Sequence, residues 1–471
     1  MQPATQNNFT VDLLNALALQ PTDDQLQAVR LLTAFITGSG GEGIFILKGY
    51  AGTGKTTLLA ALTKVLHRFV LLAPTGRAAK VLSSYSGFPA STIHRHIYKL
   101  SHAADGNFRL VKNQNKSKSV IYIVDESSMI GDSSTEESFN GNSDLLTDLM
   151  EFVFSGENCK LILVGDTAQL PPVKSEYSPA LDSGYVQSIA QMLVTETELK
   201  QVVRQEEAGG ILLNATALRI LISRNAVTPV LKTSGFNDIE QISGYDLKDV
   251  LEQSFHNYGF NEVLIITKSN KAANQYNQLI RRQILWYEDE LCGGDRLMMV
   301  RNNYFWLESD SKAGFIANGD TAEVQRVKNV EERYGLRFAI VQLRLIDYPE
   351  EPSFEATVLL DTLYSEVSSI SFARSKQLYE ALQLEFADQP PKERRKLIKE
   401  NPYYNALQVK FAYAVTCHKS QGGQWKSVFV DQGYMTDEMK STAHLRWLYT
   451  AFTRATEKLY LINFDSALFK P

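Results

Sequence analysis

The residues Gly49 to Thr56, GYAGTGKT, have the types and spacing of a phosphate-binding loop, G-x-x-x-x-G-K-[ST]. The apolar run GIFILK ends directly before them, and the helical pattern TTLLAALTKVL overlaps their end. Backbone N–H groups of such a turn converge on a polyphosphate, and its lysine reaches the β and γ oxygens. The segment therefore predicts binding of a nucleoside triphosphate through Gly49, Ala51, Gly52, Thr53, Gly54, Lys55, Thr56 and Thr57.

Two adjacent acids, Asp125 and Glu126, end the apolar strand pattern VIYIV. Paired acids at a strand end also occur as a turn or a helix cap, but beside a phosphate loop they indicate hydrolysis. Asp125 and the Thr56 hydroxyl would hold Mg²⁺, and Glu126 would polarise the attacking water. Gln169 follows the strand pattern LILVGD, so it is a candidate to meet the γ-phosphate, with an ordinary surface glutamine as the alternative.

Thr75 and Arg77 follow another strand pattern, in the segment APTGRAAK. They are therefore expected along the carboxyl edge of the same sheet, where open α/β sheets bind ligands. A plain Pro-Thr-Gly turn is the alternative interpretation.

The elements that must position these residues alternate along the chain. From residue 43 to 165, the runs GIFILK, FVLLA, VIYIVD and LILVGD alternate with helical patterns, which predicts a parallel sheet covered by helices. A second alternation begins near residue 208 and resumes with SVFVD and KLYLINF. Between them, EVQRV, FAIVQLRLI and FEATVLL with intervening turns predict a small antiparallel barrel followed by a charged helical stretch. Its KERRKLIK run is interpreted as a solvated helix face rather than a nucleic-acid patch.

Length and composition bound the class of protein. A chain of 471 residues with 44% hydrophobic and 21% charged residues predicts a multidomain globular protein. No apolar stretch approaches the ~20 residues that span a bilayer, and the first residues lack the pattern of a secretory or transit signal. Cys159, Cys292 and Cys417 lack the spacing of a zinc site or a disulfide framework, which favours a reducing compartment. Together these features predict a cytoplasmic protein that does not contact a membrane. The net charge of −5 argues against coating nucleic acid, although a local basic groove remains compatible.

Nine segments in order resemble the sequential motifs of superfamily 1 helicases. They are PTDDQLQAV, GYAGTGKT, APTGRAAKVL, STIHRHI, DESSM, GDTAQLPPV, LKQVVRQ, CHKSQGGQWKSVFVD and LYTAFTRATEKLYL. The nearest resemblance is to the 5′-to-3′ branch, superfamily 1B, which includes RecD-like enzymes and the phage Dda helicase. It spans residues 21 to about 464, although the insert at 322 to 405 carries no motif.

This resemblance implies an α/β fold of two RecA-like P-loop NTPase domains with a short β-hairpin insert and an SH3-like β-barrel insert. The first motor domain would cover 1–197, with the hairpin at 98–119. The second would cover 198–321 and 406–471, and the accessory domain 322–405. The implied activity is that of a monomeric ATP-dependent DNA helicase or translocase that uses ATP and Mg²⁺, moves 5′ to 3′ on single-stranded DNA and unwinds duplex.

The resemblance also assigns roles to single residues. Gln25 would contact adenine, Arg204 and Arg454 would reach the γ-phosphate from the second motor domain, and Gln421 would sense the nucleotide. Residues expected to touch single-stranded DNA are Thr75, Arg77, His94, Thr416 and His418. For the two histidines, a structural role is the alternative.

Phe108 is expected to act as a wedge against the last base pair of a duplex, because the insert at 100–119 falls where the family carries a strand-splitting hairpin. Tyr98 competes for that role, and simple packing is a further alternative.

Several alternatives stay open on the sequence. A small-molecule or nucleotide kinase also needs a phosphate loop and paired acids, but it has no use for Arg204, Arg454 and the block at 410 to 455. A non-hydrolytic switch would not need Glu126 as a base. Within the motor class, RNA as the track and a translocase without unwinding remain open. The expected partners are single-stranded DNA and single-strand/duplex junctions, with replication or repair proteins as open candidates.

Overall fold

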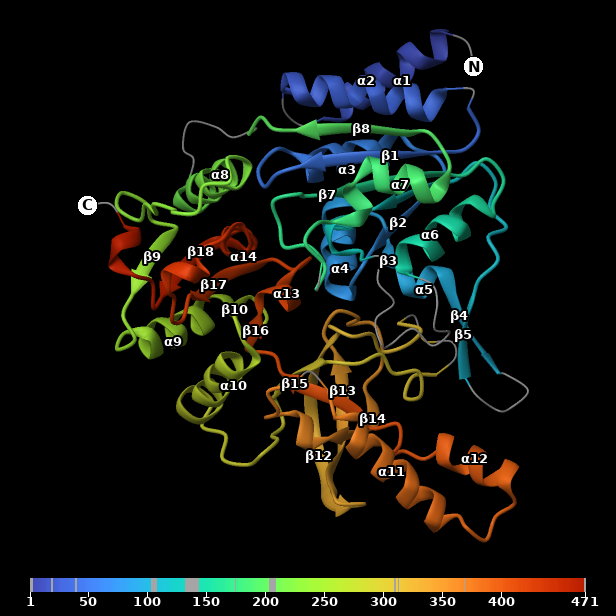
Figure 1. Cartoon of the computed structure of the whole chain (residues 1–471), viewed down its shortest axis with the longest axis vertical. Coiled ribbons are helices and arrows are strands. Elements are labelled where there is room, and N and C mark those ends of the chain that lie inside the picture. Colours follow the sequence, from blue (N-terminus) through green and yellow to red (C-terminus); the bar gives the residue numbers. More distant parts are fainter. Residues whose placement is uncertain are drawn as a thin grey trace.

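The computed structural model describes residues 3–17, 20–38, 40–102, 108–131, 144–173, 175–202, 209–308, 311, 313–367 and 369–469. Figure 1 shows two sheets with their helices side by side and a barrel beneath them. In the described part of the chain, no helix is both long enough and apolar enough to cross a membrane.

The first motor domain is built on a six-stranded sheet of order β3-β2-β6-β7-β1-β8, in which every neighbouring pair is parallel. Its strands are β1 (Gly43–Gly49), β2 (Phe69–Ala73), β3 (Ala90–Thr92), β6 (Ile121–Val124), β7 (Lys160–Gly165) and β8 (Val194–Leu199). Its helices are α1 (Pro3–Ala16), α2 (Asp23–Thr37), α3 (Lys55–Val65), α4 (Gly76–Ser86), α5 (Ile93–Ile97), α6 (Leu145–Phe154) and α7 (Ser183–Ala190).

The central strands β1, β6 and β7 are almost wholly apolar and buried because helices cover both of their faces, whereas the edge strands β3 and β8 carry polar residues. In β1, Ile44 and Ile46 join one core cluster with α6, whereas Phe45 and Leu47 join another with α2 and α3. Successive strand residues point to opposite faces, so a continuous apolar run fills both cores. The parallel register brings the carboxyl ends of β1, β6 and β7 to one edge of the sheet.

The second motor domain has a five-stranded parallel sheet of order β16-β10-β17-β18-β9. Its strands are β9 (Ile239–Ile242), β10 (Val263–Thr267), β16 (Ala414–Thr416), β17 (Trp425–Asp431) and β18 (Ala455–Ile462). Its helices are α8 (Gly210–Ser223), α9 (Leu247–Tyr258), α10 (Asn270–Leu279), α13 (Cys417–Ser420) and α14 (Thr442–Phe452).

A closed five-stranded barrel interrupts this second domain. Its strands are β11 (Arg296–Met299), β12 (Thr321–Arg333), β13 (Leu336–Leu345), β14 (Phe354–Leu359) and β15 (Leu407–Phe411). The expectation of an antiparallel barrel is wrong at one seam, because β14 and β15 pair in parallel. Five strands cannot alternate in direction around a closed ring, and the helical crossover α11 (Phe372–Glu385) and α12 (Pro391–Lys399) supplies the connection that a parallel pair needs.

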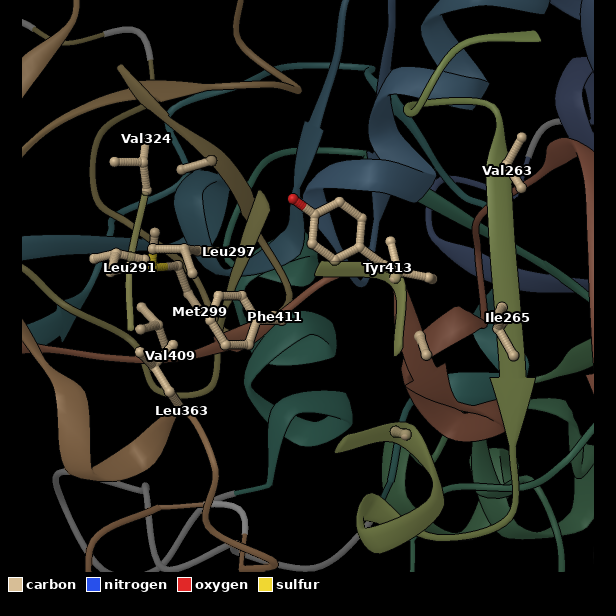
Figure 2. Packing of buried hydrophobic residues seen from close by; sticks show 14 of the residues in the cluster. Val263, Ile265, Leu291, Leu297, Met299, Val324, Leu363, Val409, Phe411 and Tyr413 are labelled. Atoms are coloured by element: carbon tan, nitrogen blue, oxygen red, sulfur yellow. The ribbon is translucent and has the colours of Figure 1, made fainter. Parts of the chain in front are cut away.

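The barrel and the second motor domain share one hydrophobic core. Figure 2 shows Val263 and Ile265 of β10 on one side, barrel residues such as Leu297 and Val409 on the other, and Tyr413 between them. Because these side chains form one buried cluster, the barrel is packed onto the motor domain rather than linked to it by a flexible tether.

The predicted fold class is confirmed. The two parallel α/β sheets, the two-stranded hairpin β4 (Tyr98–His102) with β5 (Phe108–Lys112), and the closed barrel are all present. The barrel strands begin at Arg296 and end at Phe411, so they extend on both sides of the 322–405 segment predicted for the insert.

Candidate active site between the two motor domains

The phosphate loop connects the end of β1 at Gly49 to the start of α3 at Lys55. Gly52 and Gly54 have φ values of +77° and +86°, a backbone conformation that strains other residues. A Cβ on Gly49 would lie 2.9 Å from Thr53 Oγ1 and 3.1 Å from Leu199 Cβ, so only glycine fits there. The loop thus has the tight turn and the helix N-terminus that a polyphosphate requires.

Lys55 lies folded over its own loop. Its Nζ donates hydrogen bonds to the carbonyl oxygens of Gly49 (2.6 Å) and Tyr50 (2.9 Å), and it lies 3.9 Å from Asp166 Oδ2. Asp166 follows β7 and is buried. The Lys55 ammonium can exchange these carbonyl and carboxylate partners for phosphate oxygens, so the arrangement fits a triphosphate.

The two acids predicted from the sequence lie at the end of β6. Asp125 accepts hydrogen bonds from the Tyr85 hydroxyl (2.5 Å) and from the Glu126 backbone N–H (2.8 Å). Burial raises the pKa of Asp125, and the Tyr85 hydrogen bond and Lys55 oppose that rise. Glu126 has a φ of +53°, a conformation that costs energy outside glycine and often marks a functional position.

Arg454 brings the second motor domain to Glu126. It is buried just after α14, and its Nη1 lies 3.9 Å from Glu126 Oε1. Burial raises the pKa of Glu126, and the Arg454 guanidinium is the largest opposing influence. The same guanidinium donates to the carbonyl oxygens of Thr450 (3.0 Å) and Gly423 (3.1 Å), which fix its orientation.

Gln421 of the second motor domain contacts the loop after β7, which carries Gln169. The Gln421 amide donates to the carbonyl oxygen of Leu170 at 2.7 Å, and the Thr450 hydroxyl accepts from the Leu170 N–H at 2.8 Å. The Gln169 side chain is buried, and its Oε1 has no hydrogen-bond partner among the described residues. A buried amide oxygen without a partner is costly, which fits a group that meets a bound ligand.

Gln25 lies on α2 against the phosphate loop. Its amide nitrogen donates to the Thr53 carbonyl oxygen at 3.2 Å, and its oxygen accepts from the Thr22 N–H at 3.1 Å as part of a capping box. These contacts place Gln25 next to the nucleotide-binding loop. Its contact with adenine stays a prediction.

The two residues predicted to hold Mg²⁺ are Thr56, in the first turn of α3, and Asp125, directly after β6. Within the residues that the structure describes, no group of three or more His, Cys, Asp and Glu side chains gathers as a metal site. Mg²⁺ at a triphosphate keeps several waters and takes phosphate oxygens with one or two protein ligands, so its binding through Thr56 and Asp125 stays a prediction.

Three of the residues predicted to contact DNA line one cavity. Thr75, Arg77 and His418 border a hollow of about 310 Å³ between the two motor domains and the barrel. Trp425, Ile346 and other apolar side chains complete its walls. The cavity is therefore a candidate section of a nucleic-acid groove.

Arg77 is engaged by the chain itself. It donates to the Gln424 carbonyl oxygen at 3.0 Å, lies 3.5 Å from Asp347 Oδ1, and stacks over the Trp425 ring at 5.1 Å. Lys80 lies 3.6 Å from the same Asp347 oxygen. The Asp347 carboxylate of the barrel therefore forms ion pairs with both of these cations of α4.

The other predicted DNA contacts are placed differently. Thr416 is the residue before α13 and makes no side-chain cap there. Thr75 uses its side chain to cap α4, accepting from the Ala78 N–H. His94 is the second residue of α5 and lies beside Tyr98, and burial lowers its pKa to about 4, so its imidazole is neutral. Burial also lowers the pKa of His418.

Two predicted residues are described incompletely or not at all. Arg204 lies outside the described residues. Phe108 begins β5, and its backbone pairs with that of His102 across the hairpin. Its competitor Tyr98 is anchored, because its hydroxyl donates to Asp148 Oδ2 at 2.6 Å. That bond makes Tyr98 the weaker candidate for a wedge.

Four residues near the two sites gain importance only from the structure. Tyr449 lies within the segment LYTAFTRA, yet its spacing gives no sign that the hydroxyl crosses to the other domain. Asp166 ends a recognised strand without an assigned role. Tyr85 and Asp347 carry no motif, and only the fold brings them to Asp125 and Arg77.

Comparison with known proteins shows which families the two motor domains resemble. Residues 20–221 match the family described as an AAA domain, and residues 411–462 match the UvrD-like helicase C-terminal domain. The ATP-dependent RecD2 DNA helicase of Deinococcus radiodurans is 34% identical over 38% of this chain and 22% of its own length. The ATP-dependent DNA helicase Dda of Enterobacteria phage T4 is 23% identical over 56% of this chain and 58% of its own length.

An uncharacterized protein of Acanthamoeba polyphaga mimivirus is 23% identical over 93% of this chain and 98% of its own length. The chain thus spans nearly all of that relative, but 22% of the length of RecD2 and 58% of the length of Dda. A solved structure of a Pif1 helicase from Bacteroides with ADP-AlF3 and ssDNA superposes over 96% of this chain and 95% of that chain, with 14% identity and a TM-score of 0.48. That superposition is loose, and the assignment rests on the ordered motifs and the sequence matches. The two family models and the RecD2 and Dda relatives support the resemblance to the superfamily 1B helicases, the branch of the RecD-like and Dda-like enzymes.

Proposed function

We propose that this chain is an ATP-dependent DNA helicase that translocates 5′ to 3′ along single-stranded DNA and separates duplex ahead of it. The observation that carries the proposal is the junction of the two motor domains. There Lys55 lies 3.9 Å from Asp166, and Arg454 of the other domain lies 3.9 Å from Glu126. A phosphate loop, a candidate base and a cation supplied by a second domain are the parts that coupled hydrolysis needs.

At this junction each residue has a distinct task. The loop N–H groups and Lys55 bind the phosphates, and Glu126 orients and polarises the attacking water. Mg²⁺, held by Thr56 and Asp125, would neutralise charge that develops between the β- and γ-phosphates. Arg454 stabilises the charge spread over the γ oxygens in the transition state.

Hydrolysis becomes motion because Arg454 and the phosphate loop belong to different domains. ATP favours the arrangement in which both contact it, and loss of the γ-phosphate removes that preference. The predicted DNA contacts lie on both domains as well, with Arg77 on α4 and His418 on α13. Alternating closure would therefore move a bound strand past the two domains.

Single-stranded DNA and its junctions with duplex are the proposed substrates. RecD2 and Dda are named as DNA helicases, and the Pif1 structure contains ssDNA. In this chain the cavity beside Thr75, Arg77 and His418 offers hydroxyl, guanidinium and imidazole groups, which suit phosphate contacts without reading sequence. The hairpin β4–β5 is the proposed strand separator.

A kinase is the second candidate from another class. It would need the phosphate loop and the paired acids, but its acceptor site would not be expected to involve a cation delivered from a second α/β sheet. The contact of Arg454 with Glu126 favours the motor.

Steady-state ATP hydrolysis with and without oligo-dT tests the proposal. The wild type is expected to be stimulated strongly by the single strand, and Glu126→Gln is expected to lose nearly all turnover while still binding nucleotide. Glu157→Gln, which removes an exposed carboxylate paired with Lys118, is the matched control and should behave as wild type. Hydrolysis that is indifferent to DNA in the wild type would contradict the helicase.

A further inference from the structure

The hydroxyl of Tyr449 joins the two motor domains at the phosphate loop. Tyr449 belongs to α14 of the second domain and is buried. Its oxygen accepts a hydrogen bond from the Ala51 N–H of the first domain at 2.7 Å, and it donates to Asp166 Oδ2 at 2.6 Å. One phenol therefore contacts both the loop that binds phosphate and the carboxylate beside Lys55.

The hydrogen-bond partners of the Tyr449 hydroxyl are unusual for a buried tyrosine, because both belong to the candidate nucleotide site of the other domain. The Ala51 N–H belongs to the loop whose amides are expected to face phosphate oxygens. In this structure its hydrogen-bond acceptor is instead the Tyr449 hydroxyl of the opposite domain. Asp166 also accepts from the Ala168 N–H at 2.9 Å and lies 3.9 Å from Lys55. The hydroxyl thus sits within a network that includes the phosphate-binding lysine.

The same helix positions Arg454. Tyr449 and Thr450 of α14 contact the first domain through Ala51, Asp166 and the Leu170 N–H, and Arg446 one turn earlier donates to the carbonyl oxygens of Thr167 and Gln169. Four residues after Thr450, the Arg454 guanidinium donates back to the Thr450 carbonyl oxygen and reaches Glu126. A shift of Tyr449 relative to the phosphate loop would therefore move Arg454 relative to Glu126.

We infer that Tyr449 is a positioning residue for ATP hydrolysis. Its hydroxyl ties the phosphate loop and Asp166 to α14 and so sets the reach of Arg454 toward the γ-phosphate. This inference rests on the proposed function, because it concerns the turnover of the same site. It assigns to Tyr449 no contact with the reacting atoms.

Replacement by phenylalanine keeps the ring and removes only the hydroxyl. The remaining loop amides and Lys55 still bind the phosphates, so the KM for ATP should stay within about twofold. Arg454 acts mainly in the transition state, so kcat should fall roughly tenfold or more, the effect of one lost hydrogen bond to a charged group. A split between kcat and KM is what positioning predicts.

Tyr413→Phe is the matched control. The Tyr413 hydroxyl is also buried, accepts from a backbone N–H, that of Arg296, at 3.2 Å and donates to a carboxylate, Asp295, at 3.3 Å. It lies at the root of the barrel rather than at the phosphate loop. Its removal should change the melting temperature as much as Tyr449→Phe does, while kcat stays close to the wild-type value.

The experiment measures kcat and KM for ATP at saturating oligo-dT, with melting temperatures, for the wild type and both variants. The inference is supported by a lower kcat in Tyr449→Phe alone. It is overturned if Tyr449→Phe keeps its kcat, or if both variants lose turnover in parallel with their melting temperatures. A wild type without DNA stimulation would instead contradict the proposed function, so the two failures are distinct.

Discussion

The two sides of the junction between the motor domains are occupied in different ways. On the nucleotide side, Lys55, Asp166, Glu126 and Arg454 face one another, and the contacts between the domains run through residues of the site itself. On the side predicted for DNA, a carboxylate from the barrel, Asp347, holds Arg77. The first side is arranged for turnover, whereas the second must exchange its own ion pairs for phosphates before it can bind a strand.

This difference predicts opposite signs for substitutions. Removal of a partner on the nucleotide side should only lower the rate of hydrolysis. Removal of the barrel carboxylate should raise the affinity for DNA. Four substitutions test or sharpen the contrast.

Arg454→Lys should have the largest effect. A lysine keeps the charge but loses the planar fork that contacts Glu126 and the carbonyl oxygens of Thr450 and Gly423, so kcat should fall by roughly 10³. Arg446→Lys is the control, because Arg446 on the same helix donates to the carbonyl oxygens of Thr167 and Gln169 and contacts neither acid of β6. Single-turnover hydrolysis with bound DNA is the measurement. Equal losses in both variants would contradict a special role for Arg454.

Phe108→Ala should separate unwinding from hydrolysis. If Phe108 acts as the wedge, strand separation should slow by about tenfold, since a single aromatic contact with a base is worth about 1–3 kcal/mol. ATP hydrolysis stimulated by single strands should stay within twofold. Val111→Ala, an exposed position on the same hairpin strand, is the control. The measurement is the unwinding rate by stopped-flow fluorescence, and an unchanged rate in Phe108→Ala would contradict the wedge role of Phe108.

Asp347→Asn should tighten DNA binding. The substitution releases Arg77 and Lys80 from a buried carboxylate, and a gain of about 1 kcal/mol corresponds to roughly fivefold in Kd. Asp361→Asn, which breaks the barrel ion pair with Arg374, should leave Kd unchanged. Fluorescence anisotropy with labelled oligo-dT at two salt concentrations tests this. Weaker binding by Asp347→Asn would show that the carboxylate organises the groove instead of blocking it.

Tyr85→Phe should produce the smallest effect, visible in the pH profile. The Tyr85 hydroxyl lowers the pKa of Asp125 against the rise caused by burial. Without that hydroxyl, the Asp125 pKa moves up, and the carboxylate that would hold Mg²⁺ becomes protonated at a higher pH. The acid limb of kcat against pH should therefore shift toward higher pH. A shift to lower pH would contradict this electrostatic role.

The sequence predicted the parts whose signal is local. GYAGTGKT carries its own turn and helix start, and the strand patterns of β1, β6 and β7 place their carboxyl ends at one edge. The two sheets and the barrel follow from the same alternation of apolar residues.

The parts that depend on contacts over long distances could not be predicted. Tyr449 meets Ala51 across 398 positions, and Asp347 meets Arg77 across 270, so no local pattern links them. The parallel seam between β14 and β15 follows from closing five strands, a property of the whole barrel rather than of either strand. Local chemistry could therefore be predicted, and the family resemblance pointed to Arg454, whereas the contacts of Tyr449 and Asp347 between domains needed the structure.

Strand separation on tailed duplexes tests the central claim most directly. A duplex with a 5′ single-stranded tail, a duplex with a 3′ tail and a blunt duplex would each be mixed with the protein, ATP and Mg²⁺, with Glu126→Gln as the inactive control. The account predicts that the 5′-tailed duplex alone is unwound, and only by the wild type. Separation of the 3′-tailed duplex alone would contradict the direction, and hydrolysis with no separation of any duplex would contradict a helicase.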